Sequence, residues 1–211
     1  MSTIDDISTL LQQGRAPKVQ ALVAQAIEEG YEPKKILEEG LLAGMNIIGV
    51  KFKNNEVFVP EVLISARAMN KGIEVLKPYL VKAGVEDKGT AIIGTVKGDL
   101  HDIGKNLVKM MLEGKGLKVI DLGVDVPAEK FVEAAKENNA SLICCSALLT
   151  TTMNEIKTVV DAVNASDIRP QVKIMIGGAP VTQSFCDSIG ADCYTADATS
   201  ASEAALAYCI Q

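Results

Sequence analysis

The spacing of apolar residues divides the chain into two parts. Up to about residue 80, apolar side chains recur three or four positions apart, the spacing of one face of an amphipathic helix. Four such stripes with short connections predict a small helical bundle. Pro17, Pro33 and Pro60 are expected to begin three of the helices, and Pro78 to end the last one. The stripes are Ile4, Ile7, Leu10 and Leu11; Val19, Leu22, Val23, Ala26 and Ile27; Ile36, Leu37, Leu41, Met45 and Ile48; and Val62, Ala66, Met69, Ile73 and Leu76.

Beyond residue 89 the pattern changes to short apolar runs that alternate with helical stretches. Strands this apolar, separated by helices, are typical of a parallel sheet covered on both faces. Five such units predict a doubly wound domain with the flavodoxin-like strand order 2-1-3-4-5. The expected strands are Thr90–Val96, Leu117–Leu122, Leu142–Leu148, Val172–Ile176 and Asp192–Thr195, and the expected helices are Ile103–Glu113, Ala128–Asn138, Met153–Ala165, Val181–Ile189 and Ser200–Cys209.

The expected fold is therefore α/β: an N-terminal four-helix bundle followed by a Rossmann-like, doubly wound parallel sheet of five strands. We expect the two parts to be separate domains, residues 1–82 and 89–211. The segment 83–88 between them is short, polar and contains glycine, which is typical of a linker.

Composition and charge narrow the classes of function. The 211 residues carry a formal net charge of -6, whereas a nucleic-acid-binding protein would need a basic face. The N-terminus lacks the features of a secretory signal, and no apolar run is long enough to cross a bilayer. The five cysteines are an odd number without a Cys-x-x-Cys pair, which favours reduced thiols over a zinc site or a disulfide framework. We expect a cytoplasmic protein that binds neither nucleic acid nor a membrane.

The strongest indication of chemistry is the single histidine, His101, which follows the first expected strand. Asp99, His101 and Gly104 fall in the order Asp-x-His-x-x-Gly. This spacing places an imidazole on a loop and a carboxylate two residues upstream, where the carboxylate can orient the ring. The glycine leaves room for a bulky group to approach the backbone.

The predicted strand order brings other polar groups to the same place. Ligands of open parallel sheets bind beyond the carboxyl ends of the strands where the order reverses, here between the first and third strands. The loop after the third strand carries four hydroxyl residues. The loop after the fourth carries a double glycine. We expect imidazole, hydroxyl groups and bare backbone to line one crevice suited to a large, partly apolar ligand. The residues of these two loops are Ser146, Thr150, Thr151 and Thr152, and Gly177-Gly178-Ala179-Pro180.

His101 could bind a metal, act as an acid or base, or satisfy a local hydrogen bond. A metal held by protein ligands alone is implausible, because the chain has no second histidine and no cysteine cluster. A metal already coordinated by a macrocycle needs only one axial ligand. Asp99 would then accept the proton of the other imidazole nitrogen and fix the tautomer. In the alternative without a cofactor, Asp99 or Asp102 caps the following helix and Gly104 packs the helix on the sheet.

Three motifs resemble the cobalamin-binding signature of corrinoid proteins, as found in methionine synthase and in anaerobic methyltransferase systems. They are Gly98-Asp-Leu-His-Asp-Ile-Gly-Lys-Asn, Ser146-Ala-Leu-Leu-Thr150-Thr-Thr152 and Gly177-Gly-Ala-Pro. The N-terminal part resembles the four-helix cap of the same group. Its motifs are Gly44-Met-Asn-Ile-Ile-Gly, Val57-Phe-Val-Pro-Glu-Val-Leu and Ala66-Arg-Ala-Met. The resemblance spans nearly the whole chain.

The resemblance implies a role for each matching residue. His101 would be the lower axial ligand of cobalt in place of the cofactor's benzimidazole, and Asp99 would hold its ring. Thr152 stands where the third member of this relay, often serine, stands in the family. Phe58 would cover the upper face of the corrin. The remaining contacts implied are Ser146, Thr150, Gly178 and Ala198 along the nucleotide tail, and Gly98, Asp102, Ile103, Gly104, Leu148 and Gly177 elsewhere on the cofactor.

The implied function is that of a methyl carrier, which alternates between methylcobalamin and cob(I)alamin. One partner would be a substrate-specific corrinoid methyltransferase for methanol, a methylamine, a betaine or a methoxylated aromatic. A second methyltransferase would pass the methyl group to tetrahydrofolate or a thiol coenzyme, and a reductive activase would restore the cofactor. The chain itself has no room for a substrate barrel of about 250 residues. We therefore expect a carrier subunit without stand-alone catalysis.

Three other functions share parts of this pattern. The small subunit of an adenosylcobalamin-dependent mutase also carries Asp-x-His-x-x-Gly, but it lacks a preceding helical cap. A cobalamin-dependent regulator would need a DNA-reading helix rich in Lys and Arg, and none is apparent. A flavodoxin-like signalling domain with an incidental histidine would bind no coloured cofactor.

Overall fold

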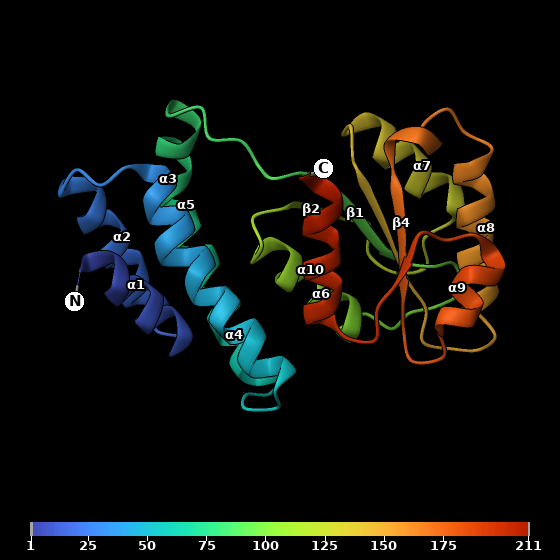
Figure 1. Cartoon of the computed structure of the whole chain (residues 1–211), viewed down its shortest axis with the longest axis horizontal. Helices are drawn as coiled ribbons and strands as arrows, with labels where there is room; N and C mark the ends of the chain where they lie inside the picture. Colours follow the sequence, from blue (N-terminus) through green and yellow to red (C-terminus); the bar gives the residue numbers. More distant parts are fainter. Residues whose placement is uncertain (1, 211) are drawn as a thin grey trace. The chain divides into compact units, whose positions relative to one another are not determined.

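The computed structural model describes residues 2–210, and their elements are shown in Figure 1. The chain divides into two units. One comprises the residues up to Asp87 together with Gly114–Gly116, and the other comprises Lys88–Glu113 and the rest of the chain from Leu117. Each unit is described separately. No helix among residues 2–210 combines the length and the apolar character needed to span a bilayer.

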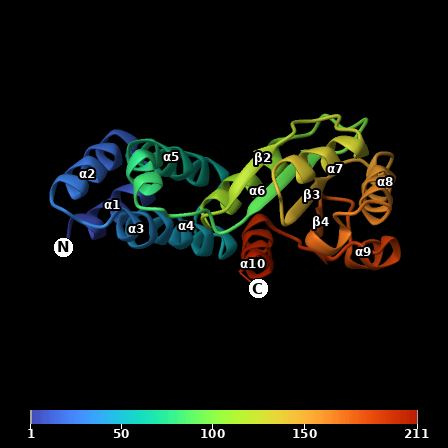
Figure 2. The same cartoon turned by 90° about the horizontal axis from the view of Figure 1, so that it is seen from above.

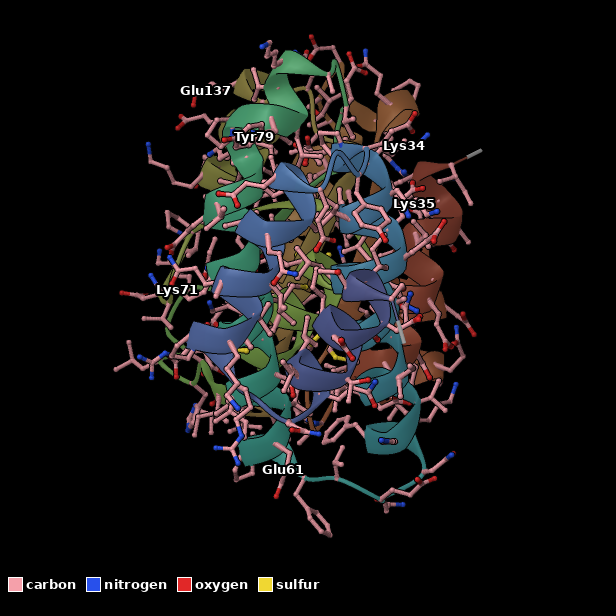
Figure 3. The ribbon with its side chains drawn as sticks, turned by 90° about the vertical axis from the view of Figure 1, so that its left-hand side faces the viewer. Lys34, Lys35, Glu61, Lys71, Tyr79 and Glu137 are labelled. Atoms are coloured by element: carbon pink, nitrogen blue, oxygen red, sulfur yellow. The ribbon has the colours of Figure 1, made fainter. Side chains whose placement is uncertain are left out.

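The first unit is a helical bundle, which faces the viewer in Figure 3. Its helices are α1 (Thr3–Gln12), α2 (Ala16–Glu28), α3 (Pro33–Lys35), α4 (Ala43–Lys53) and α5 (Val59–Lys82), and a π-helical stretch, Ile36–Leu42, joins α3 to α4. The segment Pro33–Lys53 is therefore continuous and acts as one helix, so the predicted four helices are confirmed. Apolar side chains from all four helical segments are buried in its core, including Ile7, Leu11, Val19, Ile36, Met45, Met69 and Leu76.

Small residues allow the helices of the bundle to approach closely. A methyl group on Gly44 would lie 3.1 Å from the backbone oxygen of Ser8, so α1 and α4 pack backbone against backbone at this point. A methyl group on Gly72 would lie 2.7 Å from a methyl carbon of Leu41. Charged side chains lie at the surface, as Figure 3 shows for Lys71 on α5, which pairs with Glu74.

Pro78 does not end the last helix, contrary to the prediction from the sequence. It lies inside α5, which continues to Lys82. A proline removes one backbone donor from the helix, which leaves one carbonyl oxygen without its usual partner. Because Pro78 is exposed, water can bond that oxygen. The helix ends instead where Gly84 adopts a left-handed conformation with φ of 67°, and the amide of Val85 bonds back to Leu80.

The second unit contains one parallel sheet with the order β2-β1-β3-β4-β5, which confirms the predicted order (Figure 1). Its register is fixed by apolar pairs, since Ile92 in β1 pairs with Ile120 in β2 and with Ile143 in β3. β3 ends at Ser146, two residues earlier than predicted, because the following residues turn toward the loop after β1. The strands are β1 (Thr90–Thr95), β2 (Lys118–Asp121), β3 (Leu142–Ser146), β4 (Lys173–Gly177) and β5 (Cys193–Tyr194).

Helices cover both faces of this sheet, as Figures 1 and 2 show. α7, α8 and α9 bury one core against Ile92, Ile143 and Ile174. α6 and α10 bury a second core against Ile93 and Leu142 on the opposite face. The doubly wound architecture expected from the sequence is therefore present. The helices are α6 (Ile103–Glu113), α7 (Ala128–Glu137), α8 (Met153–Asn164), α9 (Gln183–Ile189) and α10 (Ala198–Cys209).

A buried ion pair joins the start of α6 to the end of β2. Lys105 Nζ lies 2.6 and 2.7 Å from the two carboxylate oxygens of Asp121, and its side chain is only 2% exposed. The amide of Gly123 donates to the same carboxylate at 2.9 Å. Burial opposes ionisation of Asp121, but the hydrogen bonds from Lys105 and Gly123 and the charges of Lys105 and Lys109 prevail and lower its pKa.

This ion pair makes the stability of the protein sensitive to acid. The pKa of Asp121 is lower in the folded than in the unfolded protein. The contribution of the ionised carboxylate to the free energy of unfolding is therefore complete above the unfolded pKa of about 4 and is lost as the pH falls toward the folded pKa. Asp121→Asn is expected to cost about 2 kcal/mol at neutral pH and to flatten the loss of unfolding free energy below about pH 5. Urea unfolding of the cofactor-free chain across this pH range measures both effects.

The control is Asp161→Asn, which breaks the exposed pair between Asp161 and Lys157. This variant should keep the wild-type pH dependence, because surface pairs contribute less than about 1 kcal/mol. The same pH dependence in Asp121→Asn and wild type would contradict the account of the buried pair.

Candidate functional site

His101 lies on the loop between β1 and α6, at the carboxyl end of the sheet where the strand order reverses. The loop leaves β1 with the amide of Val96 bonded to the carbonyl of Ser146 at 3.0 Å. It then turns through Gly98, whose φ is 78°. The hydroxyl of Thr95 donates to the carbonyl of His101 at 2.8 Å. Both ends of the loop are therefore attached to β1 and β3.

A hydrogen-bonded chain joins His101 to Asp99 and Thr152. His101 Nδ1 lies 2.7 Å from Asp99 Oδ1, and Thr152 Oγ1 donates to Asp99 Oδ2 at 2.7 Å. Since an ionised carboxylate only accepts, Nδ1 carries the proton, and in the neutral imidazole Nε2 keeps its lone pair. The His101 side chain is 49% exposed, whereas that of Asp99 is fully buried. The site thus presents an oriented imidazole whose Nε2 can bind a metal.

Asp99 is held as a carboxylate by further donors. It accepts the amides of His101 at 3.0 Å, Leu148 at 2.8 Å and Leu149 at 3.3 Å. Burial opposes its ionisation, but these bonds, led by that of Thr152, outweigh it and hold the pKa well below the usual range. Asp99 therefore stays ionised at neutral pH and can stabilise positive charge on the imidazole.

Thr152 bonds to Asp99 and does not cap the helix that follows it. It occupies the N-cap position of α8, where a threonine hydroxyl usually accepts a hydrogen bond from the first turn. Here the hydroxyl makes no capping bond and donates to Asp99 instead. Thr152, which stands where the family often has serine, therefore keeps a hydroxyl within hydrogen-bond distance of the Asp99 carboxylate.

The geometry does not support the simpler interpretation in which Asp99 caps α6. Its carboxylate is directed to His101 and to the loop after β3. Asp102 lies immediately before α6, and its carboxylate accepts from the side chain of Asn106 at 3.0 Å. Gly104 is exposed, and a methyl group there would meet no atom within 4 Å, so close packing against the sheet does not explain this glycine.

Large apolar side chains remain exposed around the imidazole. Leu100 is 71% exposed and Ile103 is 78% exposed, on either side of His101 in the chain. Val124, Leu148 and Leu149 are exposed on the loops whose backbones contact the His101 loop. Exposed apolar side chains of this number on neighbouring loops are typical of a ligand-binding surface. They suit a large ring with apolar edges.

The other residues expected on the cofactor lie at the ends of the neighbouring strands, on a loop, and in one helix. Ser146 and Gly177 pair at the ends of β3 and β4. Thr150 is exposed on the loop between β3 and α8. Ala198 is buried in the first turn of α10, after β5, and so lies farther along the sheet from His101. Phe58 belongs to the first unit, where it precedes α5 and is 65% exposed.

Gly178 and Gly177 offer a matched pair of substitutions. A methyl group on Gly178 would lie 1.8 Å from the carbonyl oxygen of Ala147, and its φ of 131° disfavours any other residue. Gly178→Ala is therefore expected to cost about 3 kcal/mol or more in unfolding free energy. At Gly177 the methyl group would meet nothing within 4 Å, so Gly177→Ala should change it by less than about 0.5 kcal/mol. Equal unfolding midpoints in urea for the two variants would rule out this close approach.

Three contributions to the site were not expected from the sequence. Thr95 fixes the carbonyl of His101, and the amides of Leu148 and Leu149 bond Asp99. Asp125, from the loop after β2, bonds both Gly98 and Asp99. Asp125 follows an expected strand at the same edge of the sheet, a position that could have indicated it. Backbone amides have no sequence signature.

The donor set decides which kind of metal group fits. Among residues 2–210, no group of three His, Cys, Asp or Glu side chains is placed to hold a metal ion. A single imidazole Nε2, fixed by a buried carboxylate and surrounded by exposed apolar groups, suits a metal whose other ligands come from its own ring. The residues present therefore fit a corrinoid.

Comparisons with known proteins agree with this assignment. Residues 89–206 match a B12 binding domain, and residues 3–77 match a second family model of the same description. The dimethylamine corrinoid protein of Methanosarcina barkeri is 46% identical over 87% of this chain and 86% of its own. Trimethylamine corrinoid protein 1 of Methanosarcina mazei is 47% identical over 84% and 83%. A chain of the methanol:cobalamin methyltransferase complex of Methanosarcina barkeri is 32% identical, covers 98% of this chain and 79% of its own, and has a TM-score of 0.87.

Proposed function

We propose that this chain takes its methyl group from a compound that carries it on nitrogen. The chain belongs to the corrinoid methyl-carrier proteins with two B12 binding domains. The relatives that support this donor class are a dimethylamine and a trimethylamine corrinoid protein, 46% and 47% identical. The chain from the methanol:cobalamin methyltransferase complex is less similar, at 32%. The match of residues 3–77 to a B12 binding domain does not favour the mutase subunit, which lacks such a helical part.

The observation that carries the methyl-carrier function, as distinct from the donor class, is the series of hydrogen bonds from Thr152 through Asp99 to His101. When bound, the corrinoid supplies a cobalt that takes up a methyl group and releases it to an acceptor. His101 Nε2 would hold that cobalt. Asp99 would hold the proton on Nδ1 and raise the basicity of Nε2, and Thr152 would hold Asp99.

The surrounding residues would control access to the cofactor. Leu100, Ile103 and Leu148 would exclude water from the metal, because their exposed apolar side chains lie on the loops near His101 and at the start of α6. Ser146, Thr150 and Gly178 would contact the nucleotide tail, and Phe58 would cover the upper face. The contacts of Ser146, Thr150 and Gly178 follow from the family resemblance and from their positions at the carboxyl end of the sheet, and that of Phe58 follows from the resemblance alone.

Three partners complete the proposed cycle in the cytoplasm. The first is a methyltransferase specific for the nitrogen compound, which transfers its methyl group to the carrier. The second passes the methyl group to tetrahydrofolate or a thiol coenzyme. The third is a reductive activase that restores the cofactor after accidental oxidation. The similarity to methylamine corrinoid proteins and to a chain of the methanol:cobalamin methyltransferase complex bears on the first partner only.

The donor class can be tested with the full chain loaded with cobalamin and reduced. Extracts are prepared from cells grown on trimethylamine, a betaine, methanol or a methoxylated aromatic, and each is supplied with its own donor. We expect loss of the reduced cofactor's absorption with trimethylamine or the betaine, and none when the donor is withheld. Reaction only with methanol or the methoxylated aromatic would overturn the donor class while leaving the carrier function intact.

A further inference from the structure

Asp125 adopts a backbone conformation that its place in the fold does not explain. Its φ is 55°, in the left-handed region, and it lies on the loop between β2 and α7. Asn55 and Asn139 also have positive φ, but each follows the end of a helix, where this conformation is common. For Asp125 the left-handed conformation is unfavourable, and contacts with the surrounding structure must offset its cost.

Two hydrogen bonds from Asp125 provide that compensation. Its Oδ1 accepts the amide of Gly98 at 2.7 Å, and its own amide donates to the carbonyl of Asp99 at 3.0 Å. Both bonds thus reach Gly98 and Asp99, three and two residues before His101. In the left-handed conformation, both the backbone and the side chain of Asp125 bond to the segment Gly98–Asp99.

This contact completes a clamp on the loop that carries His101. The carboxylate of Asp99 is held by the loop after β3, through Leu148 and Thr152. The backbone of Asp99 is held from the other side by Asp125. Next to this contact, the amide of Val126 bonds to the carbonyl of Thr95 at 3.0 Å, so the β2–α7 loop is itself attached to β1.

We propose that Asp125 is a positioning residue for His101, setting the orientation of the imidazole toward the corrinoid through Gly98 and Asp99. The proposal rests on the proposed function, in which His101 binds the metal. Asp125 does not contact the imidazole in this role. It fixes the backbone from which Asp99 and His101 project, so that Nε2 meets the metal without further ordering of the loop.

Two substitutions separate the acceptor from the backbone conformation. Asp125→Gly tolerates the positive φ but removes the acceptor for the Gly98 amide. Asp125→Asn keeps an acceptor oxygen and tolerates the left-handed conformation. In the cofactor-free full chain, hydrogen exchange of the Gly98 amide should be about tenfold faster in Asp125→Gly and within about twofold of wild type in Asp125→Asn.

The second readout is the binding of hydroxocobalamin to the same proteins. Asp125→Gly should weaken the affinity by about five- to tenfold, whereas Asp125→Asn should bind hydroxocobalamin with the wild-type affinity. Asn139→Gly is the matched control, because it changes a residue with φ of 47° at the end of α7. It should alter neither the exchange of Gly98 nor the affinity.

The outcomes distinguish this role from the function on which it depends. Unchanged exchange or affinity in Asp125→Gly, or equal impairment in Asp125→Asn, would overturn the positioning role if wild type binds hydroxocobalamin. Wild-type protein that does not bind hydroxocobalamin would overturn the proposed function, and the positioning role with it. Faster exchange and weaker binding only in Asp125→Gly would support the role.

Discussion

His101→Ala is expected to bind hydroxocobalamin about 100-fold more weakly than wild type and to lose the visible spectrum of the histidine-ligated cofactor. The variant removes the imidazole whose Nε2 is available for the metal, and loss even of groups that support a metal ligand costs 10–100-fold. The fold should remain intact, because the side chain is half exposed and Asp99 keeps its bonds to Leu148 and Thr152. Titration of the cofactor-free chain with hydroxocobalamin, followed by absorption, measures both effects.

Added imidazole provides a control for this variant. A free imidazole can occupy the space left by the side chain and should restore part of the spectrum. Urea unfolding of the cofactor-free variant should differ from wild type by less than about 1 kcal/mol. A wild-type spectrum in His101→Ala without added imidazole would refute the assignment of His101 as ligand.

Asp99→Ala is expected to destabilise the cofactor-free protein by about 3–5 kcal/mol. The carboxylate is fully buried and accepts from the imidazole, three backbone amides and one hydroxyl. Alanine would leave the amides of His101, Leu148 and Leu149 without this acceptor, whereas the Thr152 hydroxyl could still donate to the carbonyl of Leu149. Urea unfolding at neutral pH, without cofactor, measures the loss.

Substitutions of Thr152 provide smaller losses of unfolding free energy with which the effect of Asp99→Ala can be compared. Thr152→Val removes one donor to Asp99 and should cost about 1 kcal/mol, whereas Thr152→Ser keeps the hydroxyl and should cost less. The expected order of stability is wild type, Thr152→Ser, Thr152→Val and then Asp99→Ala. An unfolding free energy for Asp99→Ala within about 1 kcal/mol of wild type would show that the buried carboxylate contributes little.

Most of the fold follows from patterns that act locally. Each strand of the sheet is a short apolar run, and parallel strands joined by helices have few allowed orders, so the sequence predicts the sheet and its reversal point. The helix through Pro78 was missed because the cost of a proline depends on exposure, which the pattern does not reveal. Likewise, the π-helical stretch Ile36–Leu42 lies within an ordinary helical spacing.

The site was predictable to the extent that its contacts are close in sequence. Asp99 and His101 are two residues apart, so the hydrogen bond between them could be expected. The strand order placed Thr152 in the same crevice, but its role as a partner of Asp99 came only from the family resemblance, because the two residues are 53 positions apart. Residue types alone do not specify where three loops meet. The bonds from the amides of Leu148 and Leu149 and the left-handed conformation of Asp125 depend on that meeting point.

The central claim is that Nε2 of His101 binds the metal of the corrinoid. His101 is the only histidine of the chain, so growth on ¹⁵N-histidine labels a single imidazole. In the paramagnetic cobalt(II) form, the axial nitrogen splits the electron paramagnetic resonance lines according to its nuclear spin. The account predicts that triplets in unlabelled protein become doublets in labelled protein. Triplets that persist after labelling would show that another nitrogen is the ligand and would contradict it.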